Sequence, residues 1–178
     1  MTQKKQGLIL LIVGLFLIAL SSGYRFYNAR ILSFKTDYVS VPSEKQTSNP
    51  IFIEIPSVGL KLSVEESAIV NGVWEISSKG ASHLNESADP GESGNIVIYG
   101  HNKNSLFGPI RWLKEGEKIK VVSEDGREHF YKVVKTIITS PDDIQYVSPK
   151  DEETLTLYTC TGFLDSKRHI IVAEPVNY

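Results

Sequence analysis

The hydrophobic positions of this chain form one long unbroken run near the N-terminus and many short runs after it. The long run extends from Gly7 to Tyr24 and contains no charged residue. A helix of this length, at ~1.5 Å per residue, reaches roughly 27 Å, which is enough for a thin bilayer core. The pattern predicts a transmembrane signal anchor over residues 7–24, with residues 1–6 in the cytoplasm. A cleaved signal peptide and a buried core helix are the alternatives.

The part of the chain that follows the long run divides into two. Residues 25–50 are mostly polar, have no apolar period and contain prolines at Pro42 and Pro50, which predicts a polar tether. Residues 51–178 have the length of one domain with a single core. We expect the chain in the cell membrane as a single-pass protein with this body outside the cytoplasm, because so short a leader has nothing else to export.

Short apolar or alternating runs separated by Gly, Asn, Asp and Ser clusters make the body typical of a β protein. One helical turn is expected at Leu106–Lys114, where Leu106, Ile110 and Leu113 share a face. A mainly β fold follows, a closed barrel of about eight strands with one or two short helices. The expected strands are Ile51–Ile55, Leu60–Val64, Val73–Ile76, Asn95–Tyr99, Lys118–Val122, His129–Ile138, Thr154–Thr159 and His169–Ala173.

Charge separates the anchor from the body. The chain has 19 Lys and Arg against 21 Asp and Glu. All the charged residues in its first 30 positions are basic. The body is therefore mildly acidic. This argues against nucleic-acid binding, which favours a basic stripe, and leaves peptide and glycan partners open.

Three residues of the body stand where predicted strands begin or end. Cys160, the only cysteine, follows Thr154–Thr159, His101 follows Asn95–Tyr99, and Arg168 opens the last strand. A seven-residue connection from Cys160 to Arg168 predicts neighbouring strands, which bring the guanidinium within reach of the thiol. The sequence alone leaves the distance to His101 open.

Each of these residues also has an ordinary interpretation. A lone cysteine is most often a small buried apolar residue, His101 suits a turn at a barrel rim, and Arg168 suits a solvated strand start. The other histidines give no competing signal: His129 and His169 lie in predicted strands, and His83 in a polar loop.

Six segments of the body, in order and spacing, resemble the sortase family. The most specific is the Thr-Leu-Tyr-Thr-Cys block followed closely by an arginine entering a hydrophobic strand. The Gly-His pair upstream adds weight in combination. Departures are Glu117, where the family has a shorter acid, and the compact connection after Cys160, which differs from the housekeeping class. The segments are Gly80–His83, Asp89–Asn95, Ile96–His101, Leu113–Glu117, Leu155–Cys160 and Lys167–Ala173.

This resemblance implies a sortase-type barrel and a cell-surface cysteine transpeptidase, or cysteine endopeptidase, acting on an LPXTG-like sorting signal of surface proteins or pilins. Cys160 would attack the threonine carbonyl and form a thioacyl enzyme. His101 would protonate the leaving amine and deprotonate the acceptor, an amine of a cell-wall precursor or a pilin lysine. Arg168 would hold the oxyanion or the substrate backbone.

The resemblance also places a substrate groove around the cysteine strand. Its expected contacts are Thr159, Thr161 and an apolar wall of Ile144, Tyr146 and Val147. A loop that packs its own hydrophobic residues is an equally good interpretation of that wall.

No cofactor or metal is expected to be required. The acidic residues near the groove suggest calcium, but they are not spaced like a dedicated calcium loop and suit a solvated acidic face better. They are Asp142, Asp143, Asp151, Glu152 and Glu153.

Two other functions remain as alternatives. One is a wall-modifying cysteine transpeptidase of the L,D type, whose cysteine follows a different local motif. The other is a membrane-tethered binding module on a catalytically silent sortase-like barrel. If the chain is an enzyme, we expect a slow one, since ordinary Cys and His pKa values near ~8.5 and ~6.5 leave about 3% of the thiol ionised at pH 7. Arg168 lowers the thiol pKa and burial raises it, and the sequence does not decide between them.

Overall fold

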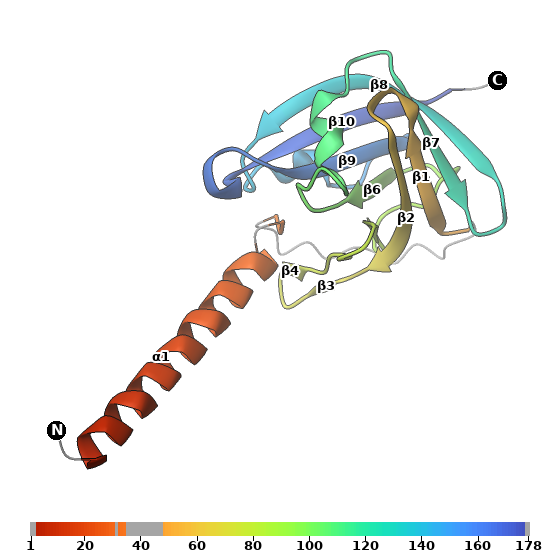
Figure 1. Ribbon diagram of the computed structural model, residues 1–178. Coiled ribbons are helices and arrows are strands. Elements are labelled where there is room, and N and C mark those ends of the chain that lie inside the picture. Colours follow the sequence, from red (N-terminus) through yellow and green to blue (C-terminus); the bar gives the residue numbers. More distant parts are fainter. Residues whose placement is uncertain (1–2, 31, 35–47, 177–178) are drawn as a thin grey trace.

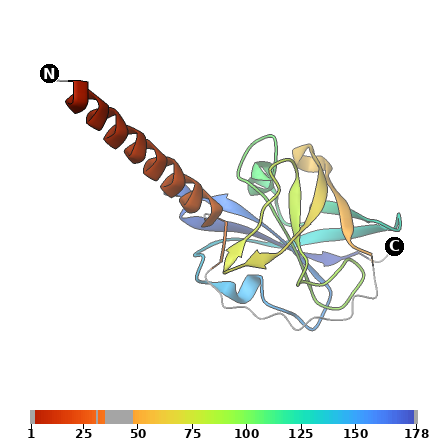
Figure 2. The ribbon, with the colours of Figure 1, turned by 90° about the horizontal axis from the view of Figure 1, so that it is seen from below.

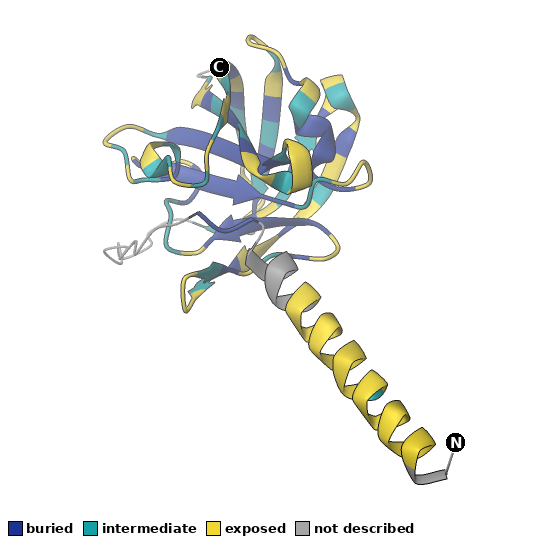
Figure 3. Ribbon diagram, turned by 90° about the vertical axis from the view of Figure 1, so that its left-hand side faces the viewer, coloured by how far each residue is buried: buried dark blue, intermediate teal, exposed yellow. Residues whose placement is uncertain are grey.

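A long helix and a β-barrel make up the part of the chain that this computed structural model describes, residues 3–30, 32–34 and 48–176 (Figure 1). Helix α1 spans Gln3–Arg30 and projects away from the barrel. Its stretch Lys5–Tyr24 is long and apolar enough to cross a membrane. Large side chains along it face outward, with Leu10 72% exposed, and Figure 3 shows the helix exposed along its described length. The buried-core-helix alternative is therefore wrong, and the helix suggests a membrane anchor.

Eight strands of the described region close into a barrel in the order β1-β2-β5-β6-β9-β10-β8-β7. Two of its neighbouring pairs, β2–β5 and β6–β9, are parallel, and the others are antiparallel. The closure leaves the barrel without an open edge. Its strands are β1 Pro50–Ile55, β2 Leu60–Ser67, β5 Ala81–Leu84, β6 Asn95–Tyr99, β7 Lys118–Ser123, β8 Glu128–Thr139, β9 Thr154–Thr161 and β10 Lys167–Pro175.

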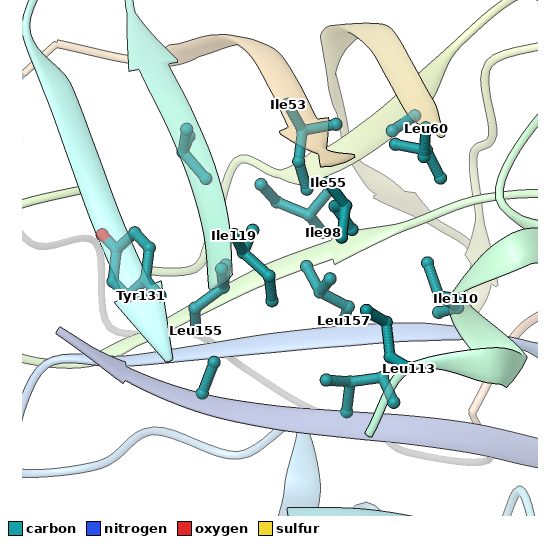
Figure 4. Packing of buried hydrophobic residues seen from close by; sticks show 14 of the residues in the cluster. Ile53, Ile55, Leu60, Ile98, Ile110, Leu113, Ile119, Tyr131, Leu155 and Leu157 are labelled. Carbon is teal, nitrogen blue, oxygen red and sulfur yellow. The ribbon is translucent and has the colours of Figure 1, made fainter. Parts of the chain in front are cut away.

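The barrel interior is filled by apolar side chains from all eight strands. Ile53, Ile98, Ile119 and Leu157 are among them, and Figure 4 shows them converging from different strands. Alternation along each strand explains this, because every second side chain points inward. The predicted mainly β, closed eight-stranded barrel is confirmed.

The remaining elements are short. Two-residue strands β3 Ile69–Val70 and β4 Val73–Trp74 form a hairpin outside the barrel. The expected helical turn over 106–114 is the 3₁₀ helix η2, Gly108–Trp112, with Ile110 buried in the interior cluster. Three further 3₁₀ turns are η1 Pro56–Val58, η3 Ile144–Tyr146 and η4 Phe163–Asp165.

One predicted barrel strand was wrong. The segment 73–76 contributes only β4, and the missing barrel strand is β5, which contains His83. His83 is fully buried, so its placement in a polar loop is also wrong. Its ring nitrogens lie 2.7 Å from Glu66 Oε1 and 3.0 Å from the Ala88 carbonyl oxygen. These partners satisfy a polar side chain inside a strand, which a pattern of apolar positions cannot reveal.

The structure differs from the predicted polar tether, residues 25–50, at both ends of that segment. Helix α1 continues through residues 25–30, and β1 begins at Pro50. Leu32 and Phe34 are buried against the barrel. Figure 2, a view from below, shows α1 ending beside the barrel. Residues 35–47 lie outside the described part.

Candidate functional site

The strand β9 has an apolar cover on each of its two faces. Leu155 and Leu157 point into the barrel interior, whereas Tyr158 and Cys160 belong to a second buried cluster. Because side chains alternate along a strand, this second cluster lies on the outward face of the barrel wall. The thiol therefore lies on the outside of the barrel and is buried by what covers it there.

Cys160 and Arg168 face each other directly across the β9–β10 pair. The antiparallel register places Arg168 opposite Cys160 and, two residues further, Ile170 opposite Tyr158. Residues directly opposite in such a pair have Cβ atoms about 4.5–5.5 Å apart and share one face. Both side chains are buried, with exposed fractions of 1% for Cys160 and 2% for Arg168. The expected proximity of guanidinium and thiol is present.

His101 reaches the same place through the parallel β6–β9 pair. Tyr99 is paired with Tyr158, and the same offset, continued for two residues, sets His101 level with Cys160. Two bonds extend the pairing past the strand: Gly100 N–H donates to the Tyr158 carbonyl at 3.3 Å, and Thr159 Oγ1 donates to the Gly100 carbonyl at 2.7 Å. The register thus sets His101 and Cys160 at the same end of two neighbouring strands.

Glycine is required at position 100 by close packing. A Cβ atom there would lie 2.7 Å from Cβ of Phe107. The backbone carbonyl of His101 accepts hydrogen bonds from the N–H groups of Lys103 and Phe107. The turn after β6 is therefore fixed on both sides of His101.

Burial controls the protonation of the thiol and the imidazole. It raises the pKa of Cys160 to about 12, while Arg168 lowers this pKa and Asp165 raises it. Burial also lowers the pKa of His101, Lys103 lowers it further, and Asp165 opposes them. At a pKa of about 12, about one thiol in 10⁵ is ionised at pH 7. The raising effect of burial on the thiol pKa therefore outweighs the lowering effect of Arg168, and this decides the question that the sequence left open.

The outward face of β9 is covered by residues 32–34, which we call the N-terminal cover. The Phe34 ring meets the Tyr158 ring edge-on, with centroids 5.0 Å apart. The Tyr158 hydroxyl donates to the Leu32 carbonyl at 3.3 Å. The backbone N–H of Trp74 donates to Ser33 Oγ at 3.0 Å. The cover is thus bound by both apolar and polar contacts.

Arg168 connects this cover to the loop after the cysteine strand. Its Nη2 donates to the Ser33 carbonyl at 2.9 Å, and its Nη1 donates to the carbonyls of Asp165 and Lys167 at 3.1 Å each. Its guanidinium also lies 5.8 Å from the centroid of the Phe34 ring. Its buried Nε has no hydrogen-bond partner among the described residues. The Nε–H group of the guanidinium is thus a donor that the described residues leave unused.

The other expected contact residues are distributed around the thiol. Val147 is a buried member of the outward cluster, and Ile144 and Tyr146 pack against it. Thr161 is half-buried at the end of β9. The hydroxyl of Thr159 is bonded to the carbonyl of Gly100. The structure therefore places the apolar wall in the same buried cluster as Cys160 and uses Thr159 to join two strands.

The acidic residues considered for calcium do not converge. Asp143 accepts from Thr139, whereas Glu153 accepts from Tyr131 and from the Gly91 N–H. Among the described residues, no group of three or more His, Cys, Asp or Glu side chains is arranged to hold a metal ion. Independence from calcium stays a prediction.

Two parts of the site were not predicted from the sequence. Leu32 and Phe34 were hidden in a segment without an apolar period, although two large apolar residues among polar ones were a usable signal. Asp165 lies in the short connection after Cys160 and contacts Asn102 and Arg168. These contacts depend on its positive φ, which the sequence does not display.

Comparisons with known proteins agree on one family. A family model described as "Sortase domain" matches residues 53–176. Sortase D of Bacillus subtilis (strain 168) is 31% identical over 129 residues, which are 70% of this chain and 62% of that protein. The chain thus matches less than two thirds of the length of this relative.

Solved structures show the same architecture. A Clostridium perfringens sortase D5 transpeptidase is similar with a TM-score of 0.62 and 26% identity, over 76% of this chain and 83% of that one. Clostridium perfringens sortase C, solved with the C-terminal cell wall sorting motif, has a TM-score of 0.61 and 24% identity, over 76% and 75% of the two chains.

Proposed function

Because the chain belongs to the sortase family, we propose that it is a membrane-anchored cysteine transpeptidase that cleaves an LPXTG-like sorting signal and transfers the acyl group to an amine. The observation that carries this proposal is the direct pairing of Cys160 with Arg168, in a register that sets His101 level with the thiol. Family membership excludes the L,D-type alternative. The catalytically silent module remains the alternative to test.

The first half of the reaction forms a thioester. The Cys160 thiolate attacks the carbonyl carbon of the threonine, and the S–C bond forms as the C–N bond to the next residue breaks. Protonated His101 gives its proton to the leaving amine. Arg168 Nε, a buried donor without a described partner, is placed to bind a carbonyl oxygen or the developing oxyanion.

The second half transfers the acyl group. An amine attacks the thioester carbon, neutral His101 takes one proton from that amine, and the C–S bond breaks to release Cys160 as the thiolate, which restores the starting thiolate–imidazolium pair. Water in place of the amine gives hydrolysis, the endopeptidase reaction. The acceptor amine, from a cell-wall precursor or a pilin lysine, is part of the proposal.

The protonation states favour a slow enzyme. The pKa of the thiol is raised to about 12 and that of His101 is lowered, so the thiolate–imidazolium form is a minor species at neutral pH. A peptide that replaces the N-terminal cover changes the burial of the thiol and so its pKa. Substrate binding and activation of the nucleophile are coupled in this proposal.

The test uses the full chain in phospholipid nanodiscs with a panel of quenched LPXTG-type peptides and an amine acceptor. We expect peptide cleavage and a thioacyl adduct on Cys160, detected by mass spectrometry, with both lost in Cys160→Ala. His101→Gln tests the proton transfer and should reduce turnover while leaving the thiol in place. Absence of Cys160-dependent cleavage across the panel, in protein whose thiol still reacts with iodoacetamide, contradicts the proposal and favours the binding module.

A further inference from the structure

The loop between β9 and β10 contains two residues in an unusual backbone conformation. Leu164 and Asp165 have φ values of 50° and 56°. The left-handed region is disfavoured for residues with a Cβ atom, although aspartate tolerates it better than leucine does. Such a conformation persists where surrounding contacts maintain it, and it is frequent at functional sites.

This conformation lets one residue contact two parts of the site. The backbone carbonyl of Asp165 accepts a hydrogen bond from Nη1 of buried Arg168 at 3.1 Å. Its side chain Oδ1 accepts from Asn102 Nδ2 at 3.5 Å, and Asn102 directly follows His101. Asp165 therefore joins the loop after the nucleophile to the turn that carries the histidine.

We propose that Asp165 is a positioning residue of the site formed by Cys160, His101 and Arg168. Its carbonyl fixes the guanidinium, and its carboxylate holds the turn at Asn102 and supplies a negative charge toward the imidazole. The inference rests on the proposed function for its catalytic meaning, but the charge and the contacts can be tested without substrate.

The charges around the two reacting groups agree with this role. Burial has the largest effect on the pKa of His101 and lowers it. Lys103 lowers this pKa further, and Asp165 acts to raise it. At Cys160, Arg168 acts to lower the pKa and Asp165 to raise it. Asp165 therefore favours the protonated imidazole that the leaving amine needs, at some cost to the thiolate.

The test compares Asp165→Asn with wild type in the full chain in detergent micelles. Asparagine tolerates a positive φ and keeps the backbone carbonyl, so the substitution removes the charge and little else. We expect the His101 titration midpoint, followed by NMR of labelled histidine and assigned with His101→Gln, to move to lower pH. Alkylation of Cys160 by iodoacetamide at pH 8 should become faster, because loss of the same negative charge also lowers the thiol pKa.

Two further variants separate positioning from general loop effects. Asp151→Asn removes an equivalent charge at an exposed position and should change neither readout. Asp165→Gly keeps access to positive φ but loses the carboxylate, and should shift the histidine in the same direction as Asp165→Asn. With an active preparation, both limbs of the kcat/KM profile should move to lower pH in Asp165→Asn. An unchanged His101 midpoint in Asp165→Asn overturns the proposal, whether or not any sorting peptide is cleaved.

Discussion

Arg168 is the side chain of the site with the most demanding set of contacts. It is buried, donates to three backbone carbonyls and keeps one donor without a described partner. A planar guanidinium serves several acceptors in fixed directions, which the single ammonium of lysine does not. A substitution that keeps the positive charge of Arg168 but removes the planar fork therefore tests the effect of its geometry on catalysis.

We predict that Arg168→Lys lowers kcat by about 10²–10³-fold, the usual cost of removing one oxyanion donor. The measurement is turnover of a cleaved sorting peptide, with folding checked by circular dichroism. Arg127→Lys makes the same chemical change at an exposed surface pair and should leave kcat unchanged. An Arg168→Lys enzyme with wild-type kcat contradicts the role given to the guanidinium fork.

Residue identities in the site were readable from the sequence, but their environments were not. Cys160 and Arg168 were expected to be close because the connection between their strands is short. The high pKa of the thiol depends on burial, and Cys160 is buried in a cluster that includes Phe34, more than a hundred positions away. Local pattern carries the first kind of information and tertiary packing the second.

At the scale of elements, the N-terminal cover is a small piece of chain with a large effect. Leu32 and Phe34 fill the outward face beside the thiol, and the Phe34 ring contacts Trp74 and Tyr158. Burial of this face contributes stability and also keeps Cys160 protonated. The two effects should change together when the cover is weakened.

We predict that Phe34→Ala lowers thermal stability and accelerates alkylation of Cys160 at pH 8. Removing a buried phenylalanine costs about 3–5 kcal/mol where its surroundings stay fixed, and less where the segment detaches. Less burial lowers the thiol pKa, so more thiolate is present at a given pH. Melting temperature and the iodoacetamide rate are the measurements.

The matched control is Phe163→Ala. Phe163 is 86% exposed in the loop beside the same site, so its truncation should change stability by no more than about 0.5 kcal/mol. Equal alkylation rates in Phe34→Ala and wild type would mean that the cover does not control the thiol.

Elements with a clear apolar run bounded by turn residues were the predictable ones. β6 was expected over Asn95–Tyr99 and occurs there, since its run is continuously apolar and bounded by turn residues. β5 was missed because Ser82 and His83 are polar and nevertheless buried. Their partners come from other parts of the chain, which periodicity along a strand does not register.

At the scale of the whole molecule, the site lies close to the end of the long helix. α1 continues about 9 Å beyond Tyr24, and three further residues lead from Arg30 to Ser33, which bonds Arg168. With residues 7–24 in a bilayer, those three residues add at most about 10 Å. In that arrangement Ser33 would lie within about 20 Å of the membrane surface, which predicts a membrane-proximal position for Arg168 and Cys160.

We predict that a sorting peptide anchored in the same liposome as the full chain is cleaved at least tenfold faster than the same peptide free in solution at equal bulk micromolar concentration. Confinement near the surface raises the effective concentration toward the millimolar range. Cleavage is followed by mass spectrometry, with Cys160→Ala as the blank. Anchored substrate in separate liposomes should lose the advantage, and equal rates for the shared and separate arrangements would contradict the membrane-proximal site.

The covered thiol also affects the chemical durability of the protein. Peroxides and similar oxidants attack the thiolate, and access to solvent sets how often they meet it. With a pKa raised to about 12 and Phe34 packed over its strand, Cys160 offers such reagents very little of the reactive form. We therefore expect the resting protein to resist inactivation by oxidation and to become vulnerable only when the cover is displaced.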